Sequence, residues 1–236
     1  MEQIENLHIP GYKIVQDKEK FCFGIDAVLL SSFARVHPND SVMDLCTGNA
    51  IVPILMSAKN HCNFTALELQ EDSIRMAKKS VELNHLEDRI NVLQGDLKNV
   101  RELFAGAQYD VVTVNPPYMR ADSRLNPNEA KNIARHEIFC SVNDVVWAAA
   151  CLLKSGGSLF MIHRPERLSE IFRACFAEKM EPKRMRFVQS FSDSEPSMVL
   201  IEARKFAKAD LKIEKPVVIY ERKGVYSKEI ESIYGR

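Results

Sequence analysis

Residues 111–118 read Val-Val-Thr-Val-Asn-Pro-Pro-Tyr, a short apolar run followed by a turn with two prolines. The β-branched run predicts a buried strand, and the Asn-Pro-Pro sequence marks the turn that ends it. The side-chain oxygen of Asn115 and the carbonyl oxygen of Pro116 can both accept hydrogen bonds from one NH₂ group. Tyr118 adds a flat face on which a planar group can stack. A proline-rich turn without a chemical role is the alternative interpretation.

This turn is suited to activating a weakly nucleophilic nitrogen. A nitrogen conjugated to a π-system is a weak nucleophile, because its lone pair is delocalised. Two acceptors that hold its hydrogens favour the charge that develops on attack and direct the lone pair towards an electrophile. The prolines stiffen the turn and supply carbonyls without competing donors. The predicted catalytic residues are Asn115, Pro116, Pro117 and Tyr118.

Composition restricts the function classes. The chain has 236 residues, and 32 Lys and Arg balance 32 Asp and Glu, so its formal net charge is zero. This length suits one domain with a sizeable core. A protein that coats nucleic acid without specificity would be basic, so any RNA or DNA site here must be a local patch.

Cysteine usage and the N-terminus predict the compartment. The six cysteines form no Cys-x-x-Cys pair and no zinc spacing, which indicates reduced thiols and no metal site. The acidic start Met1-Glu2-Gln3 lacks the apolar core of a secretory signal, and no apolar run reaches membrane-spanning length. We therefore expect a cytoplasmic protein without a membrane partner, as a monomer or weak homodimer.

From residue 41 onward, short β-rich runs alternate with amphipathic segments. The predicted strands are Ser41–Leu45, Asn63–Leu69, Ile90–Gln94, Asp110–Val114, Gly157–His163, Met185–Phe191 and Ser197–Arg204. The predicted helices are Ala27–Phe33, Glu71–Asn84, Asn143–Lys154 with Gly156-Gly157 as its stop, and one that begins at Pro165. This alternation predicts a Rossmann-like, doubly wound α/β fold, with a mainly parallel sheet between helices. The last two strands have no helix between them, so we expect them to pair antiparallel at one edge.

Polar residues follow the predicted strands, and ligands bind near strand carboxyl ends in such a sheet. After the first strand, Gly48 and Ala50 let the backbone approach a ligand closely, and Asp44 can orient the loop or a bound ammonium group. Glu68 is placed to accept both hydroxyls of a ribose, and Asp96 to accept from an adenine amino group. Each acid alone is equally consistent with a helix cap.

The glycine pattern restricts the cofactor. The sequence has no Gly-x-Gly-x-x-Gly and no phosphate-binding loop of the Gly-x₄-Gly-Lys-Ser/Thr type, which argues against a dinucleotide dehydrogenase and a P-loop enzyme. A cofactor with adenosine and a charged tail, but without pyrophosphate, fits better.

The run 42–50, with Glu68, Asp96 and the turn 115–118, resembles the class I S-adenosylmethionine-dependent methyltransferases that methylate amino groups. The resemblance implies a single-domain, seven-stranded sheet whose last strand is antiparallel, with S-adenosylmethionine as cofactor and S-adenosylhomocysteine as product. The cofactor-binding residues that it implies are Asp26, Asp44, Cys46, Thr47, Gly48, Asn49, Glu68, Leu69, Asp96, Leu97 and Asn115. The loop departs from the family pattern of two or three glycines, because Cys46 and Ala50 occupy two of those positions.

Flanking segments are similar to the bacterial tRNA1(Val) adenine-N6 methyltransferase family. They are Phe21–Leu30, Ala134–Glu137, Pro196–Leu200 and the C-terminal run that starts at Val218. This similarity implies N6-methylation of an adenosine next to the anticodon of a tRNA. It also implies that residues 1–40 cover the cofactor, 41–206 form the methyltransferase core and 207–236 pack on the core as an extension. Asp26 would steer the charged end of the cofactor, or alternatively form the N-cap of the helix Ala27–Phe33.

Other acceptors of the methyl group are also consistent with the sequence. Glutamine N5-methylation of release factors poses the same chemistry, but those relatives carry a helical N-terminal domain, and only 40 residues precede Ser41 here. Guanine N2 or adenine N6 of ribosomal RNA is a further candidate for the methyl acceptor. A non-catalytic binder that keeps the cofactor fold is the remaining hypothesis, although such a scaffold has no use for the acceptor pair in the turn.

Basic residues follow the catalytic turn in a loop long enough to bind a substrate. The candidate RNA-binding residues are Arg120, Arg124, Arg135 and His136, with Lys131 in the same loop. Two more basic clusters lie near the predicted edge hairpin: Lys183, Arg184 and Arg186, and Arg204, Lys205 and Lys208. The alternative for each cluster is a solvated surface.

Charge reversal at Arg120 and Arg135 is expected to weaken tRNA binding, because phosphate contacts supply salt-dependent affinity. Filter binding at several salt concentrations measures both quantities. Unchanged affinity together with unchanged salt dependence would remove this loop from the RNA site.

Overall fold

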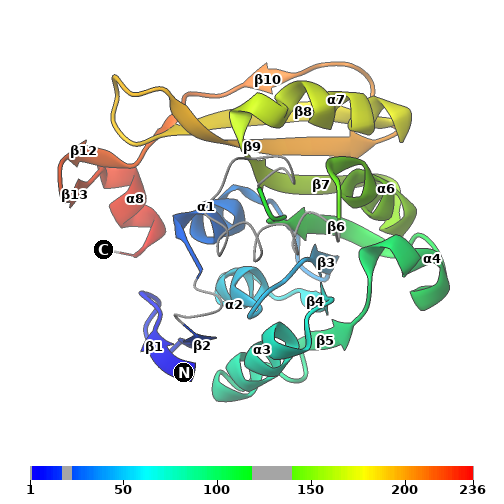
Figure 1. Cartoon of the computed structure of the whole chain (residues 1–236), viewed down its shortest axis with the longest axis horizontal. Coiled ribbons are helices and arrows are strands. Elements are labelled where there is room, and N and C mark those ends of the chain that lie inside the picture. Colours follow the sequence, from blue (N-terminus) through cyan, green and yellow to red (C-terminus); the bar gives the residue numbers. More distant parts are fainter. Residues whose placement is uncertain (1, 18–22, 119–139, 236) are drawn as a thin grey trace, which may run out of the picture.

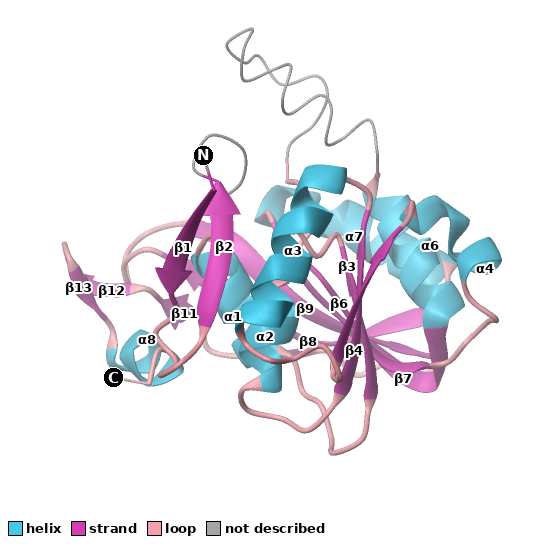
Figure 2. Cartoon of the chain, turned by 90° about the horizontal axis from the view of Figure 1, so that it is seen from below, coloured by secondary structure: helices cyan, strands magenta, loops and turns pink. Residues whose placement is uncertain are grey.

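A computed structural model describes residues 2–17, 23–118 and 140–235. One large sheet runs through the molecule, with helices on both of its faces (Figures 1 and 2). This arrangement confirms the predicted doubly wound α/β class. Among the described residues, no helix combines the length and apolar character needed to cross a membrane.

Seven strands form the central part of the sheet. They are β3 (Ser41–Leu45), β4 (Asn63–Glu68), β5 (Ile90–Gln94), β6 (Tyr109–Val114), β7 (Leu153–His163), β8 (Met180–Gln189) and β9 (Pro196–Lys205). Their order is β8-β9-β7-β6-β3-β4-β5, and β9 runs antiparallel to both of its neighbours. The expected antiparallel hairpin near one edge is therefore confirmed.

The expected count of seven strands is too low. Two short strands, β10 (Lys212–Ile213) and β11 (Val217–Val218), pair with β8 and bring the sheet to nine strands within the described residues. Because β8 would otherwise be an edge strand, the segment after β9 satisfies backbone groups that would face solvent. Strands of two residues are too short to show a periodic pattern, so they could not be predicted from the sequence.

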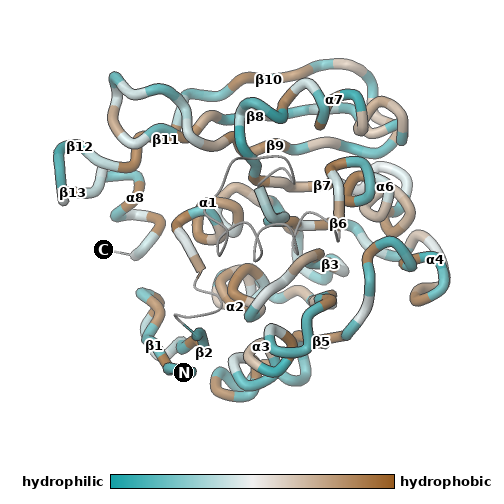
Figure 3. The backbone as a smooth tube through the Cα atoms, in the orientation of Figure 1, coloured by the Kyte–Doolittle hydropathy of each residue, from teal (hydrophilic) through white to brown (hydrophobic). Residues whose placement is uncertain are grey.

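Side-chain alternation along the strands separates two cores. Val42 packs with helices α1 (Ile25–Phe33), α2 (Ile51–Ser57) and α3 (Glu71–Leu83), whereas its neighbour Met43 packs on the opposite face. That second face is covered mainly by α4 (Val100–Leu103), α6 (Val142–Leu152) and α7 (Leu168–Ala177). Successive strand residues point to opposite faces, so both faces must be apolar. Helix α2 is buried at every residue and is largely brown in Figure 3.

The predicted end of the helix before β7 is wrong. Helix α6 ends at Leu152, and β7 begins at Leu153, so Gly156 and Gly157 lie within the strand. The pairing of β6 with β7 shifts from Tyr109 opposite Leu153 to Val111 opposite Ser158. The glycines therefore accompany an irregularity in the sheet, where Gly156 adopts a φ of +79°. The helix predicted to begin at Pro165 is confirmed, as a 3₁₀ turn Pro165–Arg167 that leads into α7.

The N-terminal segment forms a hairpin beside α3. Strands β1 (Glu2–Asn6) and β2 (Lys13–Asp17) pair antiparallel. The backbone N–H of Val15 donates to Ser80 Oγ (3.0 Å), and Asn49 Nδ2 donates to the Val15 carbonyl (2.9 Å). The hairpin thus contacts the loop that follows β3, through the hydrogen bond between Val15 and Asn49.

The C-terminal segment lies beside α1. It contains β12 (Tyr220–Arg222), β13 (Val225–Tyr226) and helix α8 (Lys228–Ile233), and Ile230 of α8 is buried in the core shared with α1. The boundaries at residues 40 and 206 stay a prediction.

The two basic clusters near the edge hairpin make internal contacts. Arg186 pairs with Glu229 (2.5 Å), and Lys205 Nζ donates to the carbonyls of Ala150 (2.5 Å) and Leu153 (2.8 Å). Arg204 Nε donates to the Gly156 carbonyl, and Lys183 Nζ donates to the Lys208 carbonyl. These side chains join segments of the fold, a role that a charge run in the sequence does not reveal.

Arg184 is the most deeply packed member of these clusters. Its Nε lies 2.8 Å from Glu202, its Nη1 lies 3.5 Å from Glu214, and its Nη2 donates to the Phe33 carbonyl (2.8 Å). The guanidinium also lies 3.8 Å from the centre of the Phe33 ring. One side chain therefore ties α1 to β8, β9 and the segment after β10.

Arg184→Ala is expected to lower the free energy of unfolding by about 3 kcal/mol, because it leaves the largely buried Glu202 carboxylate without its partner. Arg35→Ala is the matched control. Arg35 also pairs with Glu214, at 3.8 Å, but its side chain is 67% exposed, so a loss of about 1 kcal/mol or less is expected. Urea titrations measure both values, and equal losses would contradict the role of Arg184.

Candidate functional site

The site lies where the strand order reverses. Strand β3 pairs parallel with β4 on one side and with β6 on the other, and Asp44 lies opposite Thr113. In a doubly wound sheet, a crevice forms outside the carboxyl ends of strands at this position. The loops after β3 and β6 therefore leave the sheet next to each other, as predicted from their place in the sequence.

Asp44 is a buried carboxylate with hydroxyl partners. Its Oδ2 accepts from Thr47 Oγ1 and its Oδ1 from Thr113 Oγ1, both at 2.6 Å. Burial raises the pKa of Asp44 to about 7, although these two hydrogen bonds oppose the shift. Two neutral donors do not compensate the desolvated charge, so the carboxylate favours a cationic partner.

The loop after β3 turns sharply before α2. Cys46, Gly48 and Ala50 all adopt positive φ, at 55°, 60° and 65°. Thr47 N–H donates to the Leu67 carbonyl (3.2 Å), and Ala50 N–H donates to the Thr47 carbonyl (3.0 Å). The positions at which the family has glycines therefore need left-handed backbone here as well, and Cys46 and Ala50 adopt it despite their side chains.

Glu68 joins this loop to the end of β4. Its Oε2 accepts from the Gly48 N–H (2.9 Å), and its Oε1 accepts from the N–H groups of Leu69 (2.9 Å) and Gln70 (3.0 Å). At the end of the next strand, Asp96 Oδ1 accepts from the Lys98 N–H (2.9 Å) and caps a 3₁₀ turn that begins at Leu97. Asp96 therefore acts as a helix cap within the chain, which was the alternative interpretation of this residue.

Asn115 and Tyr118 contact Asp26, which lies 89 residues earlier than Asn115. Asn115 Nδ2 donates to Asp26 Oδ2 (3.0 Å), and the Tyr118 hydroxyl donates to the same oxygen (2.8 Å). The Tyr118 hydroxyl also contacts Asn115 Oδ1. The N-cap interpretation of Asp26 is wrong, because Gly24 occupies the N-cap and Asp26 lies in the first turn of α1. Its side chain reaches the catalytic turn instead.

A cavity of about 80 Å³ lies between α1, the loop after β3 and Asn115. Its lining residues are Phe23, Gly24, Asp26, Ala27, Asp44, Cys46, Thr47, Ile51, Val52 and Asn115. The buried Asp44 carboxylate beside an apolar wall suits a small cationic group, whereas Asp26 Oδ2 already accepts hydrogen bonds from Asn115 and Tyr118. The charged end of S-adenosylmethionine, with its ammonium and sulfonium groups, fits this lining.

The remaining predicted cofactor residues do not line this cavity. Gly48 lies in the loop after β3 and donates to Glu68 at the end of β4, Leu69 follows β4, and Asp96 and Leu97 follow β5. Asn49 is buried, and its Oδ1 accepts no hydrogen bond within the described residues. The sheet therefore brings all predicted cofactor residues to one edge, but only some of them to one cavity.

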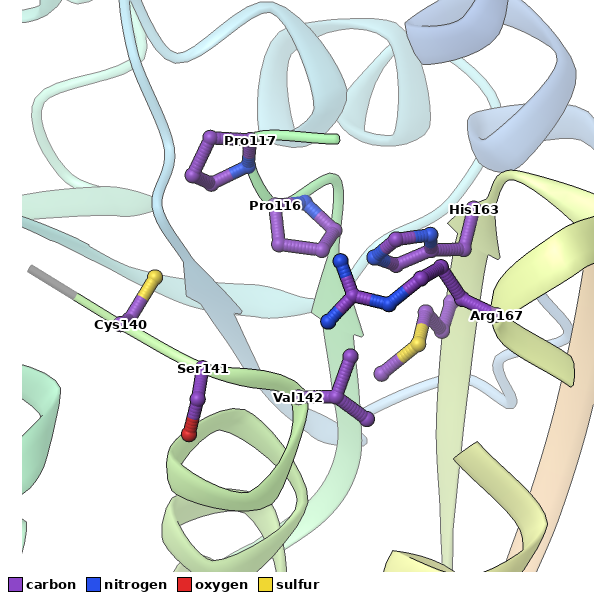
Figure 4. Close-up of a pocket in the computed structure, with 8 residues that line it drawn as sticks. Pro116, Pro117, Cys140, Ser141, Val142, His163 and Arg167 are labelled. Carbon is purple, nitrogen blue, oxygen red and sulfur yellow. The ribbon is translucent and has the colours of Figure 1, made fainter. Parts of the chain in front are cut away.

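A second pocket lies beside the two prolines (Figure 4). Its lining residues are Pro116, Pro117, Cys140, Ser141, Val142, Met161, His163 and Arg167. The guanidinium of Arg167 points towards Pro116 in Figure 4 and pairs with Glu170 at 2.7 Å. Burial, assisted by the Arg167 charge, lowers the pKa of His163 to about 4, so the imidazole is neutral at pH 7.

His163 and Arg164 are residues that the sequence analysis overlooked. The Tyr118 ring packs edge-on against His163, with centroids 5.5 Å apart, and Arg164 lies 5.4 Å from the Tyr118 ring centre. His163 is the last residue of the apolar strand β7 and Arg164 follows it, which is the same signal that identified Asp44 and Asn115. The rule that ligands bind at these strand ends therefore extends to β7.

The predicted RNA-binding residues Arg120, Arg124, Arg135 and His136 lie outside the described residues, as does Lys131. Within the ranges that the structure describes, no group of three or more His, Cys, Asp or Glu side chains is placed to hold a metal ion.

Curated relatives match nearly the whole chain. A protein from Phocaeicola vulgatus named tRNA1(Val) (adenine(37)-N6)-methyltransferase is 27% identical over 218 residues, which cover 92% of this chain and 91% of the relative. A protein of the same name from Histophilus somni is 24% identical over 224 residues, with 94% and 92% coverage.

Solved structures share the fold. The crystal structure of a predicted O-methyltransferase from Agrobacterium tumefaciens superposes with a TM-score of 0.74 at 20% identity, over 89% of this chain and 95% of that one. The family model described as methyltransferase small domain matches residues 18–184, which include the loop after β3 and the Asn-Pro-Pro-Tyr turn. The chain therefore belongs to the methyltransferase small domain family.

Proposed function

We propose that this chain is an S-adenosylmethionine-dependent methyltransferase that modifies N6 of an adenosine in tRNA, the one next to the anticodon in tRNA1(Val). The observation that carries the proposal is that Asp44 and Asn115, from the ends of adjacent strands, line one cavity. The names of the relatives from Phocaeicola vulgatus and Histophilus somni support the choice of adenine and tRNA. A tRNA substrate also favours the cytoplasm as its compartment, and we expect a monomer or weak homodimer.

The cofactor would lie across the ends of β3, β4 and β5. Asp44, with Cys46, Thr47 and the N–H groups of the tight loop, would face its methionine end. Glu68 and Leu69 would contact the ribose, and Asp96 and Leu97 the adenine, in the order in which their strands lie in the sheet. Gly48 and Asn49 would hold the loop in shape.

When bound, S-adenosylmethionine supplies the methyl group: the acceptor nitrogen bonds to its carbon as the sulfur–carbon bond breaks, the electron pair stays on sulfur, and the nitrogen loses a proton. Asn115 Oδ1 and the Pro116 carbonyl would hold the two hydrogens of the adenine amino group. Pro117 would stiffen the turn, and Tyr118 would stack on the flipped base. The nitrogen becomes acidic as it gains positive charge, so these residues orient and stabilise and none must act as a strong base.

Asn115→Ala is expected to lower kcat for tRNA methylation by about 100- to 1,000-fold, because it removes an acceptor that acts on charge formed in the transition state. The cofactor Kd should change little, since Asp44 and the loop after β3 remain. Transfer of label from S-adenosylmethionine, followed by nucleoside analysis of the tRNA, measures the rate and identifies N6-methyladenosine.

Asn91→Ala serves as the control for this experiment, because Asn91 is exposed on β5 and should leave kcat unchanged. The assay also includes ribosomal RNA and a release factor as acceptors. Undiminished turnover by Asn115→Ala on the genuine acceptor would overturn the proposed role of the turn. Label in another acceptor and none in tRNA would overturn the choice of substrate.

Cofactor affinity is expected to fall as the pH decreases below about 7, by up to about tenfold per pH unit. The cationic end of the cofactor favours ionised Asp44, whereas the pKa of this carboxyl is about 7 in the free chain, so binding at lower pH requires loss of a proton. Calorimetric titration between pH 5.5 and 8 measures the effect. Asp44→Asn should bind more weakly, with a flatter pH profile, and an unchanged profile would contradict contact between Asp44 and the cofactor's charge.

A further inference from the structure

We propose that Asp26 is a positioning residue that holds the side-chain amide of Asn115 with its oxygen directed at the acceptor amine. This inference rests on the proposed role of Asn115 in the methyl transfer. It assigns to Asp26 an action through Asn115, in place of the contact with the cofactor's charged end that the sequence suggested.

The contacts within the cluster are specific. Asp26 Oδ2 accepts from Asn115 Nδ2 at 3.0 Å and from the Tyr118 hydroxyl at 2.8 Å. Asp26 Oδ1 accepts from the Ala27 N–H at 3.0 Å, which fixes the orientation of the carboxylate at the start of α1. The cluster is part-buried, so water competes less for these hydrogen bonds than on an open surface.

An ionised carboxylate accepts hydrogen bonds and donates none. It therefore selects the rotamer of Asn115 in which the NH₂ group faces α1 and Oδ1 faces away from it. A 180° flip of the amide would point an NH₂ group at the acceptor's own NH₂ group, and both would then be donors. Asp26 Oδ2 is the acceptor described for Asn115 Nδ2, and the Tyr118 hydroxyl at Asn115 Oδ1 favours the same rotamer.

Asp26 also acts on Tyr118. A phenolic hydroxyl has one proton, so it can donate fully to Asp26 Oδ2 or to Asn115 Oδ1 but not to both. The Tyr118 hydroxyl contacts both oxygens. The charged carboxylate is the stronger acceptor, so it draws the proton away from Asn115 Oδ1, and a substrate amine can then displace the hydroxyl from that oxygen.

Gly24 provides the space for this arrangement. A Cβ atom added at Gly24 would lie 2.6 Å from Asp26 Oδ1, closer than non-bonded atoms approach. The φ of Gly24 is −106°, which any residue adopts, so the glycine is required by space and not by backbone conformation. An alanine there would displace the Asp26 carboxylate without changing its chemistry.

Three variants, Asp26→Ala, Asp26→Asn and Gly24→Ala, test the proposal in the methylation assay above. Asp26→Ala is expected to lower kcat by about 10- to 100-fold, since loss of orientation at a reacting group costs that order of rate. The cofactor Kd and the KM for tRNA should stay within about twofold to threefold. Asp26→Asn keeps an acceptor oxygen but loses the charge, so its kcat should lie between those of Asp26→Ala and the natural chain.

A role in binding the cofactor's ammonium group gives a different pattern. Charge is then essential, so Asp26→Asn and Asp26→Ala would both raise the cofactor Kd by tenfold or more, and saturating cofactor would restore kcat. That result would overturn the proposal, as would an unchanged kcat in Asp26→Ala.

The Gly24→Ala variant separates displacement of Asp26 from other effects. It is expected to lower kcat towards the value of Asp26→Ala, and to have no further effect in an Asp26→Ala background, because both changes act through one carboxylate. Additive losses of kcat in the double variant would contradict action through one carboxylate.

Circular dichroism confirms that each variant is folded, and Asn115→Ala is measured in parallel. If Asn115→Ala loses activity while Asp26→Ala keeps it, only this inference fails; if Asn115→Ala keeps activity, the proposed function fails as well.

Discussion

The parallel pairing of β3 with β6 is the constraint on which the site depends. It places Asp44 opposite Thr113 and Leu45 opposite Val114, so two segments far apart in the sequence leave the sheet side by side. Helix α2, after β3, covers one face, and α6, after β6, covers the other. Because the chain diverges here, backbone and side chains do not fill the space above the two strand ends, and a cavity forms.

Burial of the Asp44 carboxylate lowers the folding stability of the chain at this point. The residue is 2% exposed, and the side-chain hydrogen bonds described for its carboxylate come from two threonine hydroxyls. Burial raises its pKa to about 7, so near neutral pH the native chain holds a charge that its surroundings do not fully stabilise. A hydrophobic residue would pack here without this cost. Such a buried, under-compensated carboxylate in a cavity is typical of a binding site for a cation.

The parts of this structure that follow from local pattern were predictable. Apolar β-branched runs predicted β3 to β9 to within five residues at each end, and acids or an amide at the strand ends pointed to Asp44, Glu68 and Asn115. The parts that depend on distant contacts were not. Asp26 resembles an N-cap locally, but its partner is 89 residues away. Arg184 looks like part of a surface cluster, yet Glu202 and the Phe33 carbonyl enclose it.

The position of the Asn-Pro-Pro-Tyr turn explains why it has both an amide and two prolines. Asn115 lines the cavity that contains Asp44, whereas Pro116 and Pro117 line the pocket that contains neutral His163. Successive residues of the turn thus line two different spaces. A stiff backbone keeps this turn in place, because proline fixes φ and removes donors that would need partners. An in-line transfer requires the acceptor nitrogen to approach the methyl carbon directly, opposite the sulfur–carbon bond that breaks, and a rigid turn that presents acceptors can hold the nitrogen in that position.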